Sequence, residues 1–297
     1  MGQMSAFPLA APVRPLTESS PAPSPERLKA LVVPREHGAW GILLMPLLVG
    51  GAAGMHFEGK IEPVLLLLGA ALSLFWLRAP VESLLGTGVM RAQPGQERRH
   101  VISAIALAAA LSFFFLAVLL PEWNSQTLLP LASVVVIAFA TQAFLKKMGR
   151  STRMASQIVG AIGLTVTAPA AYCVATGRLD RLALGLWLAT FLFSANQVYF
   201  VQLRIHGSKL TTFKDRVRQG AGFLVAEAVV LAALLAAVRG GWLVAMSCVA
   251  FAPAILRGTA WFLQKPQPMN VRKLGWSEMR QSLAFGALLI FSVYWSH

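Results

Sequence analysis

The fold is decided by the stretch VISAIALAAALSFFFLAVLL, residues 101–120, which contains no charged residue. A helix needs roughly 20 apolar residues to cross the hydrocarbon core of a bilayer. Apolar and polar residues do not alternate in this stretch, which argues against a strand of a membrane β-barrel. Because backbone groups inside lipid must be hydrogen-bonded within the segment, the stretch predicts a transmembrane α-helix.

Further apolar segments lie on both sides of this one. The chain has 297 residues, of which 56% are hydrophobic and 13% are charged, whereas a soluble domain carries about 25% charged residues. We therefore expect an all-α fold, a polytopic membrane helix bundle of about nine transmembrane helices. The other predicted segments are 38–55, 62–78, 127–145, 155–175, 182–203, 220–238, 241–262 and 281–296.

The beginning of the chain differs in composition from the rest, because residues 1–33 are rich in Pro, Ser and Ala. They contain no apolar run followed by a cleavage site, so they do not resemble a signal peptide. We expect a disordered cytoplasmic tail over residues 1–33, with a short helix near residues 25–32. A single transmembrane helical domain is expected over residues 34–297.

The basic residues are divided unevenly between the two sides of this topology. The chain has 26 Lys and Arg against 12 Asp and Glu, a net charge of +14. One side carries 22 of the basic residues, and the other side carries Lys60, Arg178, Arg181 and Arg239. The positive-inside rule then predicts a protein of the bacterial cytoplasmic membrane with an odd number of spans, a cytoplasmic N-terminus and an external C-terminus. It also explains the net charge without nucleic-acid binding. The richer side comprises the tail, Arg78, Arg257 and the connections 79–100, 146–154, 204–219 and 263–280.

The first motif with chemical potential is PREHGAWGILLMPLLVGG, residues 34–51, which brings Arg35, Glu36 and His37 to the membrane entry. Headgroup contact explains Arg35, and the positive end of a helix dipole explains Glu36. Neither role explains His37. We therefore consider His37 a candidate catalytic residue and Arg35 a candidate ligand-binding residue.

A second motif, FWLRAPVESLLG at residues 75–86, places Arg78 and Glu82 four residues apart. On a helix that continues through Pro80, these two side chains share a face and can form an ion pair. Glu82 is thus a second catalytic candidate and Arg78 a ligand-binding candidate. The alternative is an arginine that reaches toward the headgroups with a solvated partner.

A third motif, SANQVYFVQLRIHGSKLTTFKDRVRQ at residues 194–219, places Asn196, Tyr199, Gln202 and His206 within a helical sector of about 120° that opens into a basic loop. A polar stripe inside an apolar span is expected to face protein or a cavity rather than lipid. Interhelical hydrogen bonding is the alternative explanation. These four residues and the adjacent Arg204 are candidate ligand-binding residues.

The motif PREHGAWGILLMPLLVGG closely resembles the YwiC-like family of bacterial membrane proteins, and the segments LRAP and VYFVQLR are consistent with it. The nine-span topology more distantly resembles the UbiA superfamily of intramembrane prenyltransferases. That resemblance implies a UbiA-like helix arrangement and two Asp-rich motifs that hold Mg²⁺ and a prenyl diphosphate. The chain has two aspartates, Asp180 and Asp215, with Asp180 on the predicted external side. Because Mg²⁺ prefers carboxylate oxygens, we expect no metal and no cofactor.

Together these motifs predict a cavity open to the cytoplasm that binds an anionic amphipathic ligand, an isoprenoid or a polar lipid. Arginines can bind such a headgroup directly and bidentately. Prenyl or lipid group transfer without the Asp-rich motifs is the reaction that the UbiA resemblance implies. The alternatives are a proton-coupled transporter that uses Glu227, the deepest ionisable residue, and a non-catalytic membrane scaffold.

Overall fold

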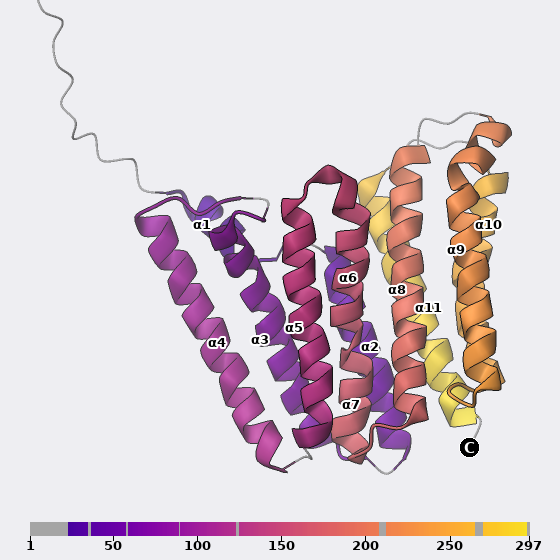
Figure 1. The fold of residues 1–297 in the computed structure, drawn as a ribbon, viewed down its shortest axis with the longest axis horizontal. Coiled ribbons are helices and arrows are strands. Elements are labelled where there is room, and N and C mark those ends of the chain that lie inside the picture. Colours follow the sequence, from indigo (N-terminus) through magenta and orange to yellow (C-terminus); the bar gives the residue numbers. More distant parts are fainter. Residues whose placement is uncertain are drawn as a thin grey trace, which may run out of the picture.

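The computed structural model describes residues 23–34, 37–57, 59–88, 90–122, 125–207, 212–264 and 270–295. Every regular element within these ranges is a helix, so the predicted all-α fold is confirmed (Figure 1). The elements are α1 (Pro25–Val32), α2 (His37–His56), α3 (Ile61–Leu85), α4 (Gln96–Glu122), α5 (Ser125–Lys147), η1 (Arg150–Thr152), α6 (Arg153–Thr165), α7 (Thr167–Thr176), α8 (Arg181–Gly207), α9 (Phe213–Arg239), η2 (Ala245–Phe251), α10 (Ala252–Leu263) and α11 (Val271–Trp295).

Eight stretches of the described chain are helical, long and apolar enough to cross a membrane. Each overlaps one of the predicted segments, so the multi-pass membrane bundle is confirmed. Two of the stretches are composite, because α6 and α7 form one and η2 and α10 form another. The stretches are Gly38–His56, Ile61–Leu85, Gln96–Pro121, Thr127–Lys147, Arg153–Thr176, Arg181–Gly207, Phe213–Arg239 and Ala245–Leu263.

The ninth predicted segment, 281–296, lies in α11, which is not among these eight stretches. The first ten residues of α11 include Arg272, Lys273, Glu278 and Arg280, which lower its mean hydropathy. In the bundle, α11 nevertheless packs against α2 and against η2 and α10, and it passes behind α8 in Figure 1. Its first half is polar and its second half is apolar.

The connections between helices gather at two opposite ends of the bundle (Figure 1). One end holds α1 and the turn between α5 and α6, and also Lys146, Lys147 and Arg204 in the last turns of α5 and α8. We call it the basic end. At the other end the chain passes from α2 to α3 beside the end of α7, where the Lys60 amide donates a 3.2 Å hydrogen bond to the Ala175 carbonyl.

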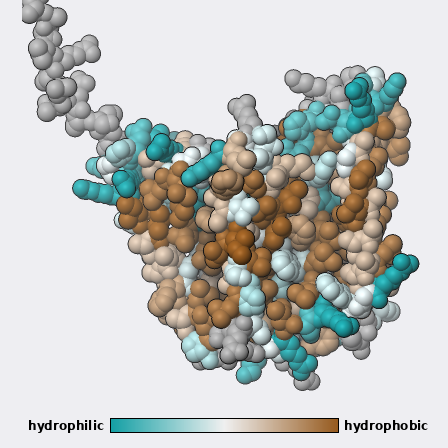
Figure 2. All heavy atoms as spheres, viewed as in Figure 1, coloured by the Kyte–Doolittle hydropathy of each residue, from teal (hydrophilic) through white to brown (hydrophobic). Residues whose placement is uncertain are grey.

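Apolar side chains form the middle of the outer surface, and hydrophilic side chains gather toward both ends (Figure 2). On α4 and α5, large apolar residues are turned outward: Phe113 is 74% exposed and Val136 is 67% exposed. Water would oppose this exposure, whereas hydrocarbon favours it, so these helices present a lipid-facing surface.

The interior is packed around α2 and α7. Gly50 lets the two helices approach closely, because a Cβ atom there would collide with the backbone of Ala168. Small residues at helix contacts allow this kind of packing in membranes. On the other side of α2, Phe193 of α8 stacks on Phe285 of α11, with ring centroids 3.9 Å apart.

Helix α1 packs on α3 and α4 at the basic end. Leu31 is fully buried, and the Ser83 hydroxyl donates a 2.8 Å hydrogen bond to the Leu31 carbonyl. Arg27 forms a two-point ion pair with Glu97, and this hydrogen bond and charge raise the pKa of the Arg27 guanidinium. The predicted short helix is thus docked on the bundle. Residues 1–22 lie outside the described residues, and the predicted disorder of the tail stays a prediction there.

Candidate functional site

The second sequence motif forms a compact group of charges at the basic end. Helix α3 continues through Pro80, so Arg78 and Glu82 form the expected pair, with 2.8 Å between Arg78 Nε and Glu82 Oε1. Lys146, from the last turn of α5, also lies 2.8 Å from the same carboxylate oxygen. We call Arg78, Glu82 and Lys146 the α3 charge group. Two cations from different helices share one carboxylate there.

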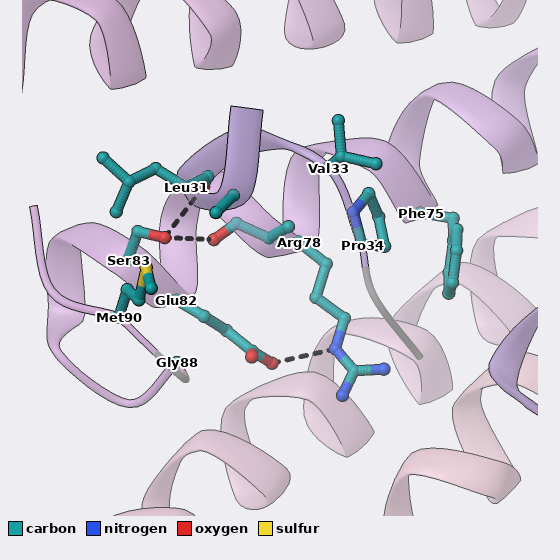
Figure 3. Close-up of a pocket in the computed structure, with 11 residues that line it drawn as sticks. Leu31, Val33, Pro34, Phe75, Arg78, Glu82, Ser83, Gly88 and Met90 are labelled. Carbon is teal, nitrogen blue, oxygen red and sulfur yellow. Dashed lines mark hydrogen bonds and ion pairs between the residues drawn. The ribbon is translucent and has the colours of Figure 1, made fainter. Parts of the chain in front are cut away.

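A cavity of about 70 Å³ lies beside this group, between α1 and the C-terminal part of α3. Figure 3 shows the Arg78 and Glu82 side chains directed toward one another, with the Phe75 ring beyond Arg78. The walls combine these charges with apolar side chains, so the cavity is amphipathic. It is lined by Ala30, Leu31, Val33, Pro34, Phe75, Arg78, Ala79, Glu82, Ser83, Gly88 and Met90.

The polar residues of the third motif face neighbouring helices. Asn196 is buried, and its amide lies 3.4 Å from the carboxylate of Glu227 on α9. The Tyr199 ring packs against Phe223 of α9, with centroids 5.7 Å apart. Interhelical contact is therefore the observed environment of this part of the stripe.

Nearer the basic end, the same helix contacts α6. The Gln202 amide donates a 2.9 Å hydrogen bond to Gln157 Oε1. His206 is exposed, and its Nδ1 lies 2.8 Å from the Gln202 carbonyl oxygen. Arg204 lies close enough to Glu278 of α11 for a favourable charge interaction.

The structure therefore places the described candidates in two separate regions. Arg78 and Glu82 line the cavity, and none of its lining residues comes from α8. His37 begins α2, although its side chain lies outside the described part of the structure, and Arg35 lies outside it altogether. The assignment of all these residues to one binding site stays a prediction.

Sequence reasoning missed a buried ion pair between α10 and α11. Arg257 Nη1 lies 2.5 Å from Glu278 Oε2, and the two side chains are 11% and 14% exposed. The Arg257 guanidinium also lies over the Phe200 ring, 4.1 Å from its centroid. A signal was present, because Glu278 is the only acid in the basic stretch 270–280.

This pair lies near the buried Asn196–Glu227 contact. Glu227 has a favourable charge interaction with Arg257, and its carboxylate approaches α10 at Gly258, where a Cβ would lie 2.6 Å from Oε1. We call Asn196, Glu227, Arg257 and Glu278 the inner charge group. Several of its polar atoms are buried without a hydrogen-bond partner: Asn196 Oδ1, Arg257 Nε and Nη2, and Glu278 Oε1.

Neither group resembles a metal centre. Among the described residues, no three His, Cys, Asp or Glu side chains lie close enough together to hold a metal ion. In the two charge groups, arginine and lysine are the partners of the carboxylates, so the donor set does not match the oxygen ligands that Mg²⁺ prefers.

The eight long apolar helical stretches of the described chain define a multi-pass helical membrane protein. The model of the YwiC-like protein family matches residues 33–172, just under half of the chain, which confirms the resemblance read from residues 34–51. The match runs from the end of α1 into α7 and includes Arg78, Glu82 and Lys146. No curated protein and no solved structure gives a significant match.

Proposed function

We propose that this membrane protein binds an anionic amphipathic ligand, an isoprenoid phosphate or a polar lipid, at its basic end. The observation that supports this most is the α3 charge group, in which Arg78 and Lys146 converge beside a largely apolar cavity. A guanidinium binds phosphate bidentately, and an ammonium binds it as a point charge. The aromatic ring of Phe75 offers the hydrocarbon part an apolar contact.

The proposal includes an orientation, in which the basic end faces the bacterial cytoplasm. Lysine and arginine are retained on that side of membrane proteins. Lys146, Lys147 and Arg204 lie at the basic end. At the other end, Lys60 precedes α3, Arg181 begins α8 and Arg239 ends α9. The ligand would then enter from the cytoplasmic leaflet.

The size of the cavity limits what enters it. Pockets that enclose a drug-sized ligand measure about 300–1,000 Å³, whereas this one measures about 70 Å³. We propose that only the headgroup lies in the cavity, while the hydrocarbon chain stays among the helices and the lipid. Glu82 holds both cations in place until a phosphate competes for them.

The reaction proposed for this site is transfer of an isoprenoid group to a nucleophilic acceptor, in which the carbon–oxygen bond to the phosphate breaks, the phosphate leaves, and Glu82 takes the proton of the acceptor. Glu82 is the described acid–base candidate, because its carboxylate lies on the cavity wall between the two cations. Arg78 and Lys146 are the proposed headgroup contacts, because both cations lie beside Glu82. Isoprenoid transfer that persists in both Arg78→Ala and Lys146→Ala would remove this assignment.

Binding can be tested with farnesyl diphosphate as the probe and farnesol as its uncharged counterpart. The purified protein in detergent is expected to be thermally stabilised by the diphosphate and much less by the alcohol. Arg78→Ala and Lys146→Ala should each weaken the diphosphate effect about tenfold or more, because each removes a charge-assisted contact. Arg239→Ala, at the opposite end, is the control and should bind like the wild type. Equal stabilisation by the two probes, or unchanged binding in both variants, would contradict the proposal.

Proton-coupled transport is the second candidate, favoured by the buried Asn196–Glu227 contact inside the bundle. Ionisable residues in membrane interiors often belong to proton or substrate paths. Proteoliposomes that take up a solute with a pH gradient, and lose this uptake in Glu227→Gln but not in Arg78→Ala, would favour transport over binding at the α3 charge group.

A further inference from the structure

The first half of α11 carries a groove that is separate from the cavity at the α3 charge group. The groove is shallow and open to its surroundings, because all of its lining residues come from α11 and the residue before it. Its lining combines three cations with an indole and an amide, and contains no carboxylate. The lining residues are Asn270, Arg272, Lys273, Trp276 and Arg280.

The spacing of residues along α11 places three cations and a tryptophan on one face of the helix. Helical steps of 100° place Arg272, Lys273, Trp276 and Arg280 within a sector of about 100°. Glu278, the acid in this stretch, points to the other side, where it pairs with the buried Arg257. The inner ion pair thus removes the one negative charge from the neighbourhood of the groove.

Because the groove precedes the apolar half of α11, we place it at the level of the lipid headgroups. Polar residues keep the first half of α11 out of the apolar part of the span, and the apolar run begins after Gln281. Trp276 and Met279 are 58% and 52% exposed, so an indole and a thioether face outward beside the cations. Tryptophan is enriched at membrane–water interfaces, where its ring lies among headgroups.

From this arrangement we infer that the α11 groove is a binding site for the headgroup of an anionic phospholipid from the surrounding membrane. The lipid phosphate lies between Arg272, Lys273 and Arg280, and the Trp276 ring packs against the glycerol region. A zwitterionic lipid carries a compensating positive headgroup, so it binds less strongly to three cations. The site is a lipid contact that does not depend on the ligand proposed for the α3 charge group.

Native mass spectrometry of the full chain with equal amounts of phosphatidylglycerol and phosphatidylcholine tests this site. The wild type is expected to retain phosphatidylglycerol in preference, and Arg272→Gln/Lys273→Gln/Arg280→Gln should reduce that preference about tenfold or more. A matched variant with the same number of changes at the opposite end, Arg178→Gln/Arg181→Gln/Arg239→Gln, should keep it. Trp276→Ala, which leaves the charges in place, should shorten lipid retention without abolishing the preference.

Two further measurements distinguish this lipid site from a phosphate site and from the ligand site proposed at the α3 charge group. Inorganic phosphate should not displace the lipid, because the indole and the membrane-facing position favour a lipid over a free anion; displacement would make the groove a phosphate site and overturn the proposal. Arg78→Ala should keep the phosphatidylglycerol preference even if farnesyl diphosphate binding is lost. An equal preference in the triple glutamine variant and the wild type would show that the lipid lies elsewhere.

Discussion

The two charge groups of this bundle contain similarly buried carboxyl groups but differ in their balance of charge. Glu82 is 9% exposed and is shared by two cations beside a cavity. In the inner charge group, Arg257 lies beside two carboxyl groups, those of Glu278 and Glu227, between tightly packed helices. Arg204 adds a second positive charge near Glu278. Two cations on one carboxylate beside a cavity favour an anionic ligand, whereas buried acids and cations in balance between packed helices favour a structural role.

The largest effect on stability is expected for Arg257→Met. The change leaves Glu278 buried without its cation, and breaking a buried pair in this way costs about 3–5 kcal/mol. Thermal unfolding in detergent should show a strong loss of stability. Arg257→Met/Glu278→Leu, which removes both charges, should recover most of it. A single variant as stable as the wild type would mean that the pair contributes little, and that the inner charge group is not structural.

A smaller effect is expected for Gly258→Ala, which tests how tightly the inner charge group is packed. A Cβ there would lie 2.6 Å from Glu227 Oε1 and 2.8 Å from Phe223 Cε1, so neighbours on α9 must shift. Overpacking of this kind costs about 1–3 kcal/mol. Gly275→Ala is the matched control, since a Cβ on that exposed part of α11 has nothing within 4 Å. Equal unfolding temperatures for the two variants would contradict the close packing of Glu227 against α10.

The smallest effect on stability is expected for Glu82→Gln, which should instead change the affinity for the anionic ligand. Glutamine removes the negative charge but keeps a side-chain oxygen that can accept hydrogen bonds from Arg78 and Lys146, so unfolding should change by only about 1–2 kcal/mol. Affinity for farnesyl diphosphate should rise, because a competitor for both cations is gone. Isothermal titration calorimetry of Glu82→Gln and of Glu82→Ala shows whether the affinity for farnesyl diphosphate rises or falls. A fall in affinity in both would mean that Glu82 contributes to binding rather than competing.

Much of the fold followed from local sequence properties. Apolar length located eight helical stretches, and the four-residue spacing of Arg78 and Glu82 predicted their ion pair once α3 continued through Pro80. The ninth segment was harder to place because α11 changes from polar to apolar halfway along. Its first half carries four charged residues, and its apolar second half is shorter than the roughly 20 residues that a membrane span needs.

The contacts between distant helices could not be predicted from one sequence. Lys146 joins Glu82 from a position 64 residues further along the chain, and Arg257 meets Glu278 across the α10–α11 connection. No local periodicity encodes either distance. For the same reason, the sequence pattern grouped Arg78 with the α8 residues, while the structure brings Lys146 of α5 to Glu82, the partner of Arg78, and brings Asn196 to α9.

The most direct test of the proposed function is native mass spectrometry of the protein purified from its own membrane. The proposal predicts an anionic amphipathic molecule that is retained by the wild type, by Arg239→Ala and by Arg272→Gln/Lys273→Gln/Arg280→Gln, and lost from Arg78→Ala. A phospholipid at the separate α11 groove would show the opposite pattern, with loss from the triple glutamine variant and retention by Arg78→Ala. A wild type from which Arg78→Ala removes no anionic amphipathic molecule would contradict ligand binding at the α3 charge group.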